Sequence, residues 1–156
     1  MKLYSFDVVL QEVPDEISLA LSISGCPMRC KGCHSSHLYN NTGEELTPAK
    51  LSELMNKYQT YISCILFMGG EWNKKELIQL LDYIKLNYPN IKTALYSGLN
   101  KIDDDILSQL DYIKLGAYKE ELGNLTSPTT NQRMYKRTPP TKELEDITYK
   151  FKSIWG

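Results

Sequence analysis

The feature that most constrains the fold is a regular alternation of apolar runs and amphipathic stretches through the middle of the chain. Four short apolar runs, each followed within two residues by glycine, are typical of buried strands, and they cover residues 17–24, 62–68, 93–96 and 112–115. Apolar residues at helical spacing predict three intervening helices, which begin near Thr47, Asn73 and Asp103. A strand–helix series of this kind predicts an α/β fold around a parallel sheet.

Chain length limits how far such a sheet can curl. Right-handed crossovers bend a βα series in one direction, and a closed eight-stranded barrel typically needs about 250 residues. With 156 residues, we expect a single domain over residues 1–156, built as an open, partial barrel or an open sheet. Residues 2–11 are expected to add a shorter strand. Residues 123–137 are polar and turn-rich, and 145–155 fit either a strand or a short helix.

Composition excludes several classes of protein. The chain has 18 Lys and Arg against 19 Asp and Glu, a formal net charge of -1, so bulk electrostatics gives no reason to expect nucleic-acid binding. No apolar run approaches the length of a membrane span. Asp7 interrupts the position where a signal peptide keeps an apolar region. We therefore expect a cytoplasmic protein with neither a nucleic acid nor a membrane as partner.

The four cysteines are unevenly distributed. Cys26, Cys30 and Cys33 follow the first apolar run in a C-x3-C-x2-C pattern, whereas Cys64 lies alone inside the second run. Buried cysteine commonly serves as a small apolar core residue, which is our prediction for Cys64. Three thiols this close cannot all pair with one another, so in a reducing compartment their clustering indicates metal or redox chemistry.

The cysteine loop allows three interpretations. The cysteines can be unligated loop residues, or they can join His34 or His37 in a tetrahedral Cys3His zinc site. Structural zinc sites usually draw on two separated segments, which disfavours that interpretation. In the third, three thiolates hold a four-iron cluster and leave one iron without a protein ligand, as a catalytic cluster requires.

Two motifs together resemble the radical S-adenosylmethionine enzymes: the cysteine triplet after the first predicted strand, and Met68-Gly69-Gly70-Glu71 at the end of the next one. Gly32 stands where most of these enzymes have an aromatic residue, and Trp72 where many have proline. Gly32 instead resembles the activating proteins of anaerobic ribonucleotide reductases, and segments 11–14, 115–118 and 127–133 are similar to that branch as well.

This resemblance implies a partial (open) β/α barrel of the radical S-adenosylmethionine type. It implies that the three cysteines Cys26, Cys30 and Cys33 ligate a 4Fe-4S cluster whose open iron binds S-adenosyl-L-methionine. Gly69, Gly70 and Glu71 would bind the amino end of that cofactor, since glycines allow close backbone approach and the carboxylate complements an ammonium. Reductive cleavage would then generate a radical that removes a Cα hydrogen from a glycine of the partner.

Four further residues are candidate cofactor contacts. Gly32 and His34 adjoin the third cysteine, and Ser97 ends the third apolar run, where its hydroxyl can bond a ribose or a carboxylate. Lys114 lies in an Asp-x-x-Lys pattern that resembles related activases, in which the lysine approaches the cofactor carboxylate.

The resemblance also implies partners. These are the large subunit of an anaerobic ribonucleotide reductase, which carries the glycyl radical, and a low-potential electron donor such as flavodoxin or ferredoxin. An open barrel favours a protein substrate, because an inserted segment can cover the missing wall. The alternatives are an activase of another glycyl radical enzyme, a radical enzyme acting on a small molecule, and a zinc-binding interaction module.

Overall fold

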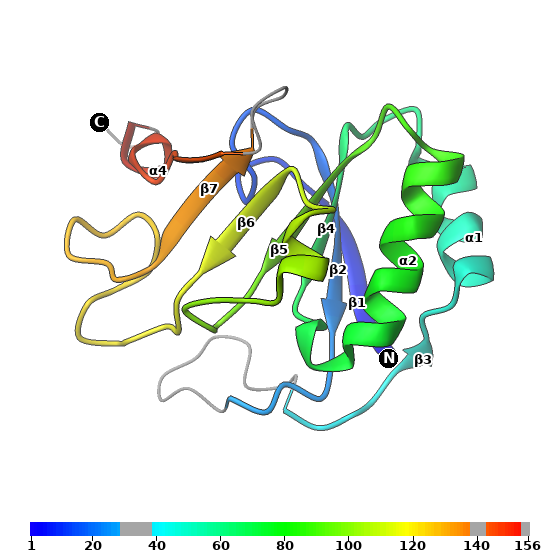
Figure 1. The fold of residues 1–156 in the computed structure, drawn as a ribbon, viewed down its shortest axis with the longest axis horizontal. Helices are drawn as coiled ribbons and strands as arrows, with labels where there is room; N and C mark the ends of the chain where they lie inside the picture. Colours follow the sequence, from blue (N-terminus) through cyan, green and yellow to red (C-terminus); the bar gives the residue numbers. More distant parts are fainter. Residues whose placement is uncertain (29–38, 138–142, 154–156) are drawn as a thin grey trace.

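The chain folds around one mixed sheet, seen in a computed structural model that describes residues 1–28, 39–137 and 143–153. The described strands number eight, in the order β3-β1-β2-β4-β5-β6-β7-β8 (Figure 1). The four central strands are parallel: β2 (Ser18–Ile23), β4 (Cys64–Met68), β5 (Lys92–Tyr96) and β6 (Tyr112–Leu115). Antiparallel strands extend both sides: β1 (Lys2–Val9), β3 (Glu44–Glu45), β7 (Arg133–Arg137) and β8 (Leu144–Asp146).

The connecting helices follow the sequence signals. The helix α1 (Pro48–Tyr58) begins after Thr47, whose hydroxyl accepts a hydrogen bond from the Lys50 amide at 3.1 Å, and proline occupies its first turn. The remaining helices are α2 (Lys74–Asn87), α3 (Asp104–Leu107) and α4 (Tyr149–Ser153), and a 3-10 turn η2 (Glu71–Asn73) precedes α2. None of the helices in the described ranges is long and apolar enough to cross a membrane.

The two faces of the sheet are covered differently. Helices α1 and α2 lie side by side on one face (Figure 1), where Leu54 and Leu81 share a buried cluster with Phe67 of β4. The opposite face has no such helix layer among the described elements. Its buried cluster contains Leu66 of β4, on the other side of the same strand, together with Val13 from the segment that joins β1 to β2. Strand alternation thus divides the core into two apolar layers.

The buried carboxylate of Glu16 holds the segment between β1 and β2 against one face of the sheet. Glu16 is 7% exposed and accepts hydrogen bonds from the hydroxyls of Ser63 and Tyr112, both at 2.8 Å, and from the Lys92 ammonium at 3.0 Å. Burial raises the pKa of Glu16, but these three hydrogen bonds outweigh it and leave the pKa below its usual value. The carboxylate is therefore held charged in a site that satisfies it.

The structure corrects several sequence expectations. The polar stretch 123–137 contains a strand, β7, and the region from 145 onward contains both a strand end and a helix rather than one or the other. The strand β1 has 8 residues and is longer than β2, which has 6. The third helix has only four residues, and Arg137 donates a hydrogen bond to the carbonyl of Leu107 at its end.

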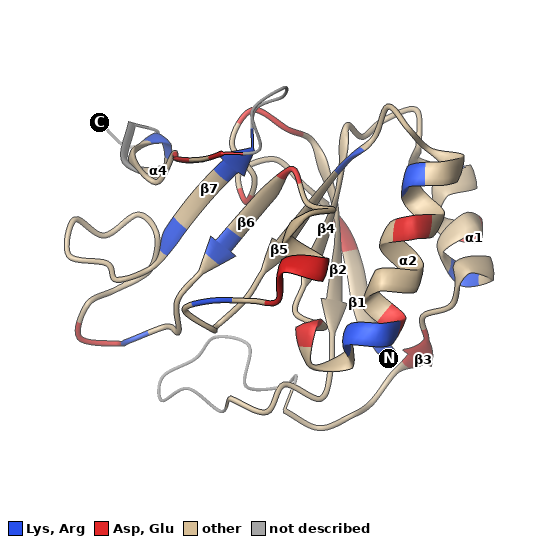
Figure 2. Cartoon of the chain, viewed as in Figure 1, with Lys and Arg blue, Asp and Glu red and all other residues tan. Residues whose placement is uncertain are grey.

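Charged residues of both signs are interspersed over the described helices and strands (Figure 2). Lys74 on α2, for example, pairs with Asp103 and Asp105 at 3.3 and 3.1 Å. Such exposed pairs contribute little to stability.

Candidate cofactor site

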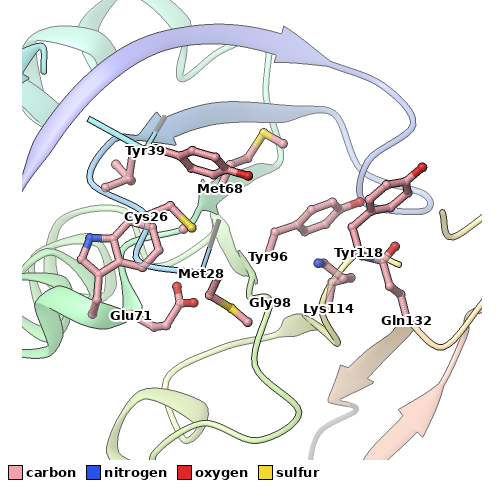
Figure 3. A pocket seen from close by; sticks show the side chains of 13 residues that line it. Cys26, Met28, Tyr39, Met68, Glu71, Tyr96, Gly98, Lys114, Tyr118 and Gln132 are labelled. Atoms are coloured by element: carbon pink, nitrogen blue, oxygen red, sulfur yellow. The ribbon is translucent and has the colours of Figure 1, made fainter. Parts of the chain in front are cut away.

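A cavity of about 140 Å³ lies at the carboxyl ends of the parallel strands, where sites of α/β proteins commonly form. Strand-terminal residues form much of its wall, with Ile23 from β2, Met68 from β4, Tyr96 from β5 and Lys114 from β6. These side chains meet because parallel strands end at the same edge of a sheet. The resulting site is a mainly apolar hollow that contains a few polar groups (Figure 3).

Cys26 is the member of the cysteine triplet that the described residues include. It follows Gly25, whose φ of +84° turns the chain away from the end of β2, and its half-buried side chain lines the cavity. Cys30, Cys33, Gly32 and His34 lie outside the described residues. Their predicted roles as cluster ligands and cofactor contacts therefore stay predictions.

The Gly-Gly-Glu turn at the end of β4 excludes side chains from its two glycines. Gly69 has φ +100°, and a Cβ there would lie 2.5 Å from Cη2 of Trp72. Gly70 has φ +107°, and its Cβ would lie 2.9 Å from the Met1 sulfur. Both positions require glycine for conformation as well as for space. The tight turn carries the chain directly from β4 into Glu71, whose side chain reaches the cavity.

The Glu71 carboxylate is held at one oxygen and unpaired at the other. Ser97, which is 1% exposed, donates its hydroxyl to Oε1 of Glu71 at 2.8 Å, and Oγ of Ser97 accepts from the Leu99 amide at 3.1 Å. Oε2 of Glu71 is buried and has no hydrogen-bond partner within the described part of the chain. Burial raises the pKa of Glu71 above its usual value, although the Ser97 hydrogen bond and the charge of Lys114 act in the opposite direction.

Lys114 brings the opposite charge into the same cavity. Its side chain is nearly buried, with the residue 8% exposed. The ammonium donates to the Gly116 carbonyl at 3.2 Å and lies 5.4 Å from the centre of the Tyr96 ring, a geometry that favours a cation–π contact. Figure 3 shows Glu71 and Lys114 on opposite sides of the pocket, with Met28 and Gly98 between them in this view.

A mainly apolar cavity with a carboxylate on one side and an ammonium on the other complements a zwitterion. The unpaired Oε2 of Glu71 can accept hydrogen bonds from an ammonium, and the Lys114 ammonium can donate to a carboxylate. Apolar walls lower the local dielectric and strengthen both interactions. The described residues thus provide contacts for an α-amino acid group beside the Cys26 thiol.

The structure brings together most of the described residues that the sequence singled out. Four of these residues line the cavity: Cys26, Gly69, Glu71 and Lys114. Ser97 donates a hydrogen bond to the Glu71 carboxylate. Gly70 shapes the turn beneath them.

Sequence reasoning missed a second set of residues around the cavity, which are Met28, Tyr39, Trp72, Tyr96, Tyr118 and Gln132. Trp72 follows the Gly-Gly-Glu turn directly, so its proximity was a signal that could have found it. Tyr118 and Gln132 belong to the loop between β6 and β7. Both lie in segments that resemble the activase branch, 115–118 and 127–133, but that resemblance gives neither residue an individual role, because they reach the cavity only through the pairing of those two strands.

Comparison with known proteins shows which family the chain belongs to. The chain is 26% identical over 131 residues to the anaerobic ribonucleoside-triphosphate reductase-activating protein of Enterobacteria phage T4, an alignment that covers 77% of this chain and 84% of that protein. The model of the 4Fe-4S single cluster domain matches residues 17–135, which include all three clustered cysteines, the Gly-Gly-Glu turn and Lys114. Because that match spans well over half of the chain, this protein belongs to the 4Fe-4S single cluster domain family.

Proposed function

We propose that this protein is a radical S-adenosylmethionine activase that installs a glycyl radical on the large subunit of an anaerobic ribonucleotide reductase. The observation that carries the proposal is the presence of Glu71, Lys114 and Cys26 around one apolar cavity at the carboxyl edge of the parallel strands. We also propose that the open α/β sheet is a partial barrel of the radical S-adenosylmethionine type, and that residues 1–156 form one domain.

The described residues fit the amino acid end of S-adenosylmethionine. Oε2 of Glu71 is a buried acceptor without a partner in the described ranges, as a site for an ammonium requires. Lys114 is a nearly buried cation, as a site for a carboxylate requires. In this proposal Cys26, Cys30 and Cys33 hold a 4Fe-4S cluster, and the family match favours that assignment over the zinc alternative.

When bound, the reduced cluster and S-adenosylmethionine together supply an electron transfer that yields a radical able to remove a hydrogen atom from glycine. The chain's own residues then have three roles. Glu71 and Lys114 orient the ligand through the ammonium and the carboxylate of its amino acid end, so that its position does not depend on the cysteine loop alone. Ser97 fixes the carboxylate of Glu71. The apolar wall, which includes Met68 and Ile23, excludes water from the reacting atoms.

Two features support a protein substrate. The relative from phage T4 is by its name an activating protein for a reductase. The sheet is open, with β3 and β8 at its edges, and an inserted segment of a partner would cover the wall that an open barrel lacks. We propose the glycine-bearing segment of the reductase as that partner, and a flavodoxin or ferredoxin as the electron donor.

The proposal is tested with protein purified without oxygen. We expect about four irons and four sulfides per chain with little zinc, and cleavage of S-adenosylmethionine under a low-potential reductant. A glycyl signal in electron paramagnetic resonance should appear only when the reductase is present. One zinc per chain in a colourless protein would refute the iron–sulfur chemistry. Cleavage without a glycyl signal on the reductase would refute the proposed partner.

A further inference from the structure

We propose that Gln132 is a positioning residue for the Lys114 ammonium, holding it where it meets the carboxylate of the bound ligand. This inference rests on the proposed function and deepens it. Gln132 lies in the loop before β7 and lines the same cavity as Lys114. The segment 127–133 resembles the activase branch, but the sequence gives Gln132 no individual role. Figure 3 shows both side chains in one region of the pocket, near Tyr96 and Tyr118.

The two side chains share one acceptor. The Lys114 ammonium donates to the Gly116 carbonyl at 3.2 Å, and the Gln132 amide nitrogen donates to the same oxygen at 3.3 Å. A carbonyl oxygen has two lone pairs, so the two donors occupy its full capacity. Gln132 thereby fixes the position of the carbonyl oxygen that anchors the Lys114 ammonium.

The backbone geometry explains why this carbonyl is available to both. Gly116 has φ +109°, and a Cβ there would lie 3.2 Å from the Asn131 carbonyl oxygen and equally close to Cα of Gln132. The chain after β6 therefore passes close against the chain before β7. A side chain at position 116 would separate the two segments and remove the shared contact.

Gln132 is itself held in place. It is 6% exposed, and its backbone amide donates to the Thr130 hydroxyl at 3.0 Å. The preceding Asn131 donates its side-chain amide to the Ala117 carbonyl at 3.0 Å. These bonds fix the loop end on both sides of the Gly116 contact, so the Gln132 side chain meets a defined acceptor rather than sampling many positions.

The face of the Tyr96 ring also lies beside the ammonium. The ring centre lies 5.4 Å from Nζ, and the Tyr96 hydroxyl donates to the Glu12 carbonyl, which fixes the ring. The ammonium thus has an aromatic face and a carbonyl that it shares with Gln132. The third direction is the cavity, on whose far side Glu71 lies.

The test compares two ligands that differ only by the carboxylate: S-adenosylmethionine and its decarboxylated analogue. Binding is measured anaerobically by calorimetry on cluster-loaded protein. We expect Gln132→Met, which keeps the length of the side chain but removes its donor, to raise the Kd for S-adenosylmethionine about tenfold. Gln132→Glu should raise it further, because its carboxylate would pair with Lys114. The Kd for the decarboxylated analogue should change by less than about twofold in both variants.

A cycle with Lys114→Met separates positioning from a structural role. If Gln132 acts through Lys114, Gln132→Met should add nothing to the loss already caused by Lys114→Met. Gln79→Met, at an exposed position of α2, is the matched control and should change neither Kd. Unfolding midpoints of all variants establish that each one is folded. If Gln132→Met does not fold, Gln132→Glu takes its place in the cycle.

Equal weakening of both ligands, additive losses in the cycle, or an unchanged Kd in folded Gln132 variants would each overturn this inference while leaving the proposed function intact. Failure of the unsubstituted protein to bind S-adenosylmethionine at all would overturn both.

Discussion

Ser97 donates its hydroxyl to Oε1 of Glu71 at 2.8 Å, because an ionised carboxylate can only accept, and its oxygen also accepts from the Leu99 amide. The hydroxyl hydrogen is thereby committed to the carboxylate. One oxygen of Glu71 is bound to the protein, and the other is left buried without a partner in the described residues. This asymmetry makes Glu71 an oriented acceptor, and it links the ends of β4 and β5 at the cavity.

Removing this hydrogen bond should weaken ligand binding. We expect Ser97→Ala to raise the Kd for S-adenosylmethionine by about tenfold or more, since a hydrogen bond to a charged group contributes about 1.5–3 kcal/mol. Binding calorimetry measures the change. Ser108→Ala is the matched control, because that exposed hydroxyl contacts only the Asp105 carbonyl among the described residues. Equal effects of the two substitutions would contradict the role of Ser97.

The raised pKa of Glu71 predicts how stability depends on pH. A folded-state pKa above the unfolded value means that the folded protein binds more protons in between, so the free energy of unfolding falls as pH rises through that interval. Glu71→Gln should remove this dependence and stabilise the ligand-free protein by about 1 kcal/mol at neutral pH. Urea denaturation at pH 5 and pH 8 measures it. The same variant should lose S-adenosylmethionine cleavage, and a less stable Glu71→Gln protein would contradict the assignment.

Glu16 predicts the opposite sign. Its pKa is lowered in the folded protein, so its contribution to stability is complete above the usual glutamate pKa and is lost as pH falls through the lowered value. Glu16→Gln should cost about 1–3 kcal/mol at pH 7, because the Lys92 and Tyr112 donors lose a charged acceptor. The cost should shrink in acid. Glu53→Gln, on the exposed side of α1, should change the free energy of unfolding little at either pH.

The parallel part of the fold could be predicted because each of its elements has a local signal. The run that ends at Gly69 reads as a buried strand by itself, and the buried stripe of α1 follows a visible cap at Thr47. β7 has no such signal. Its inner residue, Met134, is followed by half-buried Tyr135 and by Lys136, whose ammonium lies 5.7 Å from the Tyr112 ring centre. The strand forms because β6 offers an edge, and a local pattern does not contain that information.

The same distinction applies to the site. Cys26 and Glu71 could be singled out because each belongs to a motif with fixed spacing. Gln132 lies in the segment 127–133 that resembles the activase branch, but its place at the cavity could not be predicted, because it depends on the pairing of β6 with β7 and on the close approach at Gly116. The hydrogen bond from Ser97 to Glu71 was likewise outside the reach of the sequence, which predicted a ligand contact for that hydroxyl.

The last prediction concerns the two classes of cysteine. Cys64 is fully buried in β4, and burial raises its pKa to about 12, so its reactive thiolate is nearly absent at pH 8. We expect Cys64 to resist alkylation by iodoacetamide in the folded protein and to react once urea unfolds it. Cys64→Ala should lower the free energy of unfolding by about 1 kcal/mol through lost packing and leave the iron content unchanged. Cys26→Ala should have the reverse pattern, with little iron retained and an unfolding free energy close to that of the unsubstituted apoprotein. Loss of iron in Cys64→Ala, with the fold intact, would place that thiol among the ligands and contradict its assignment to the core.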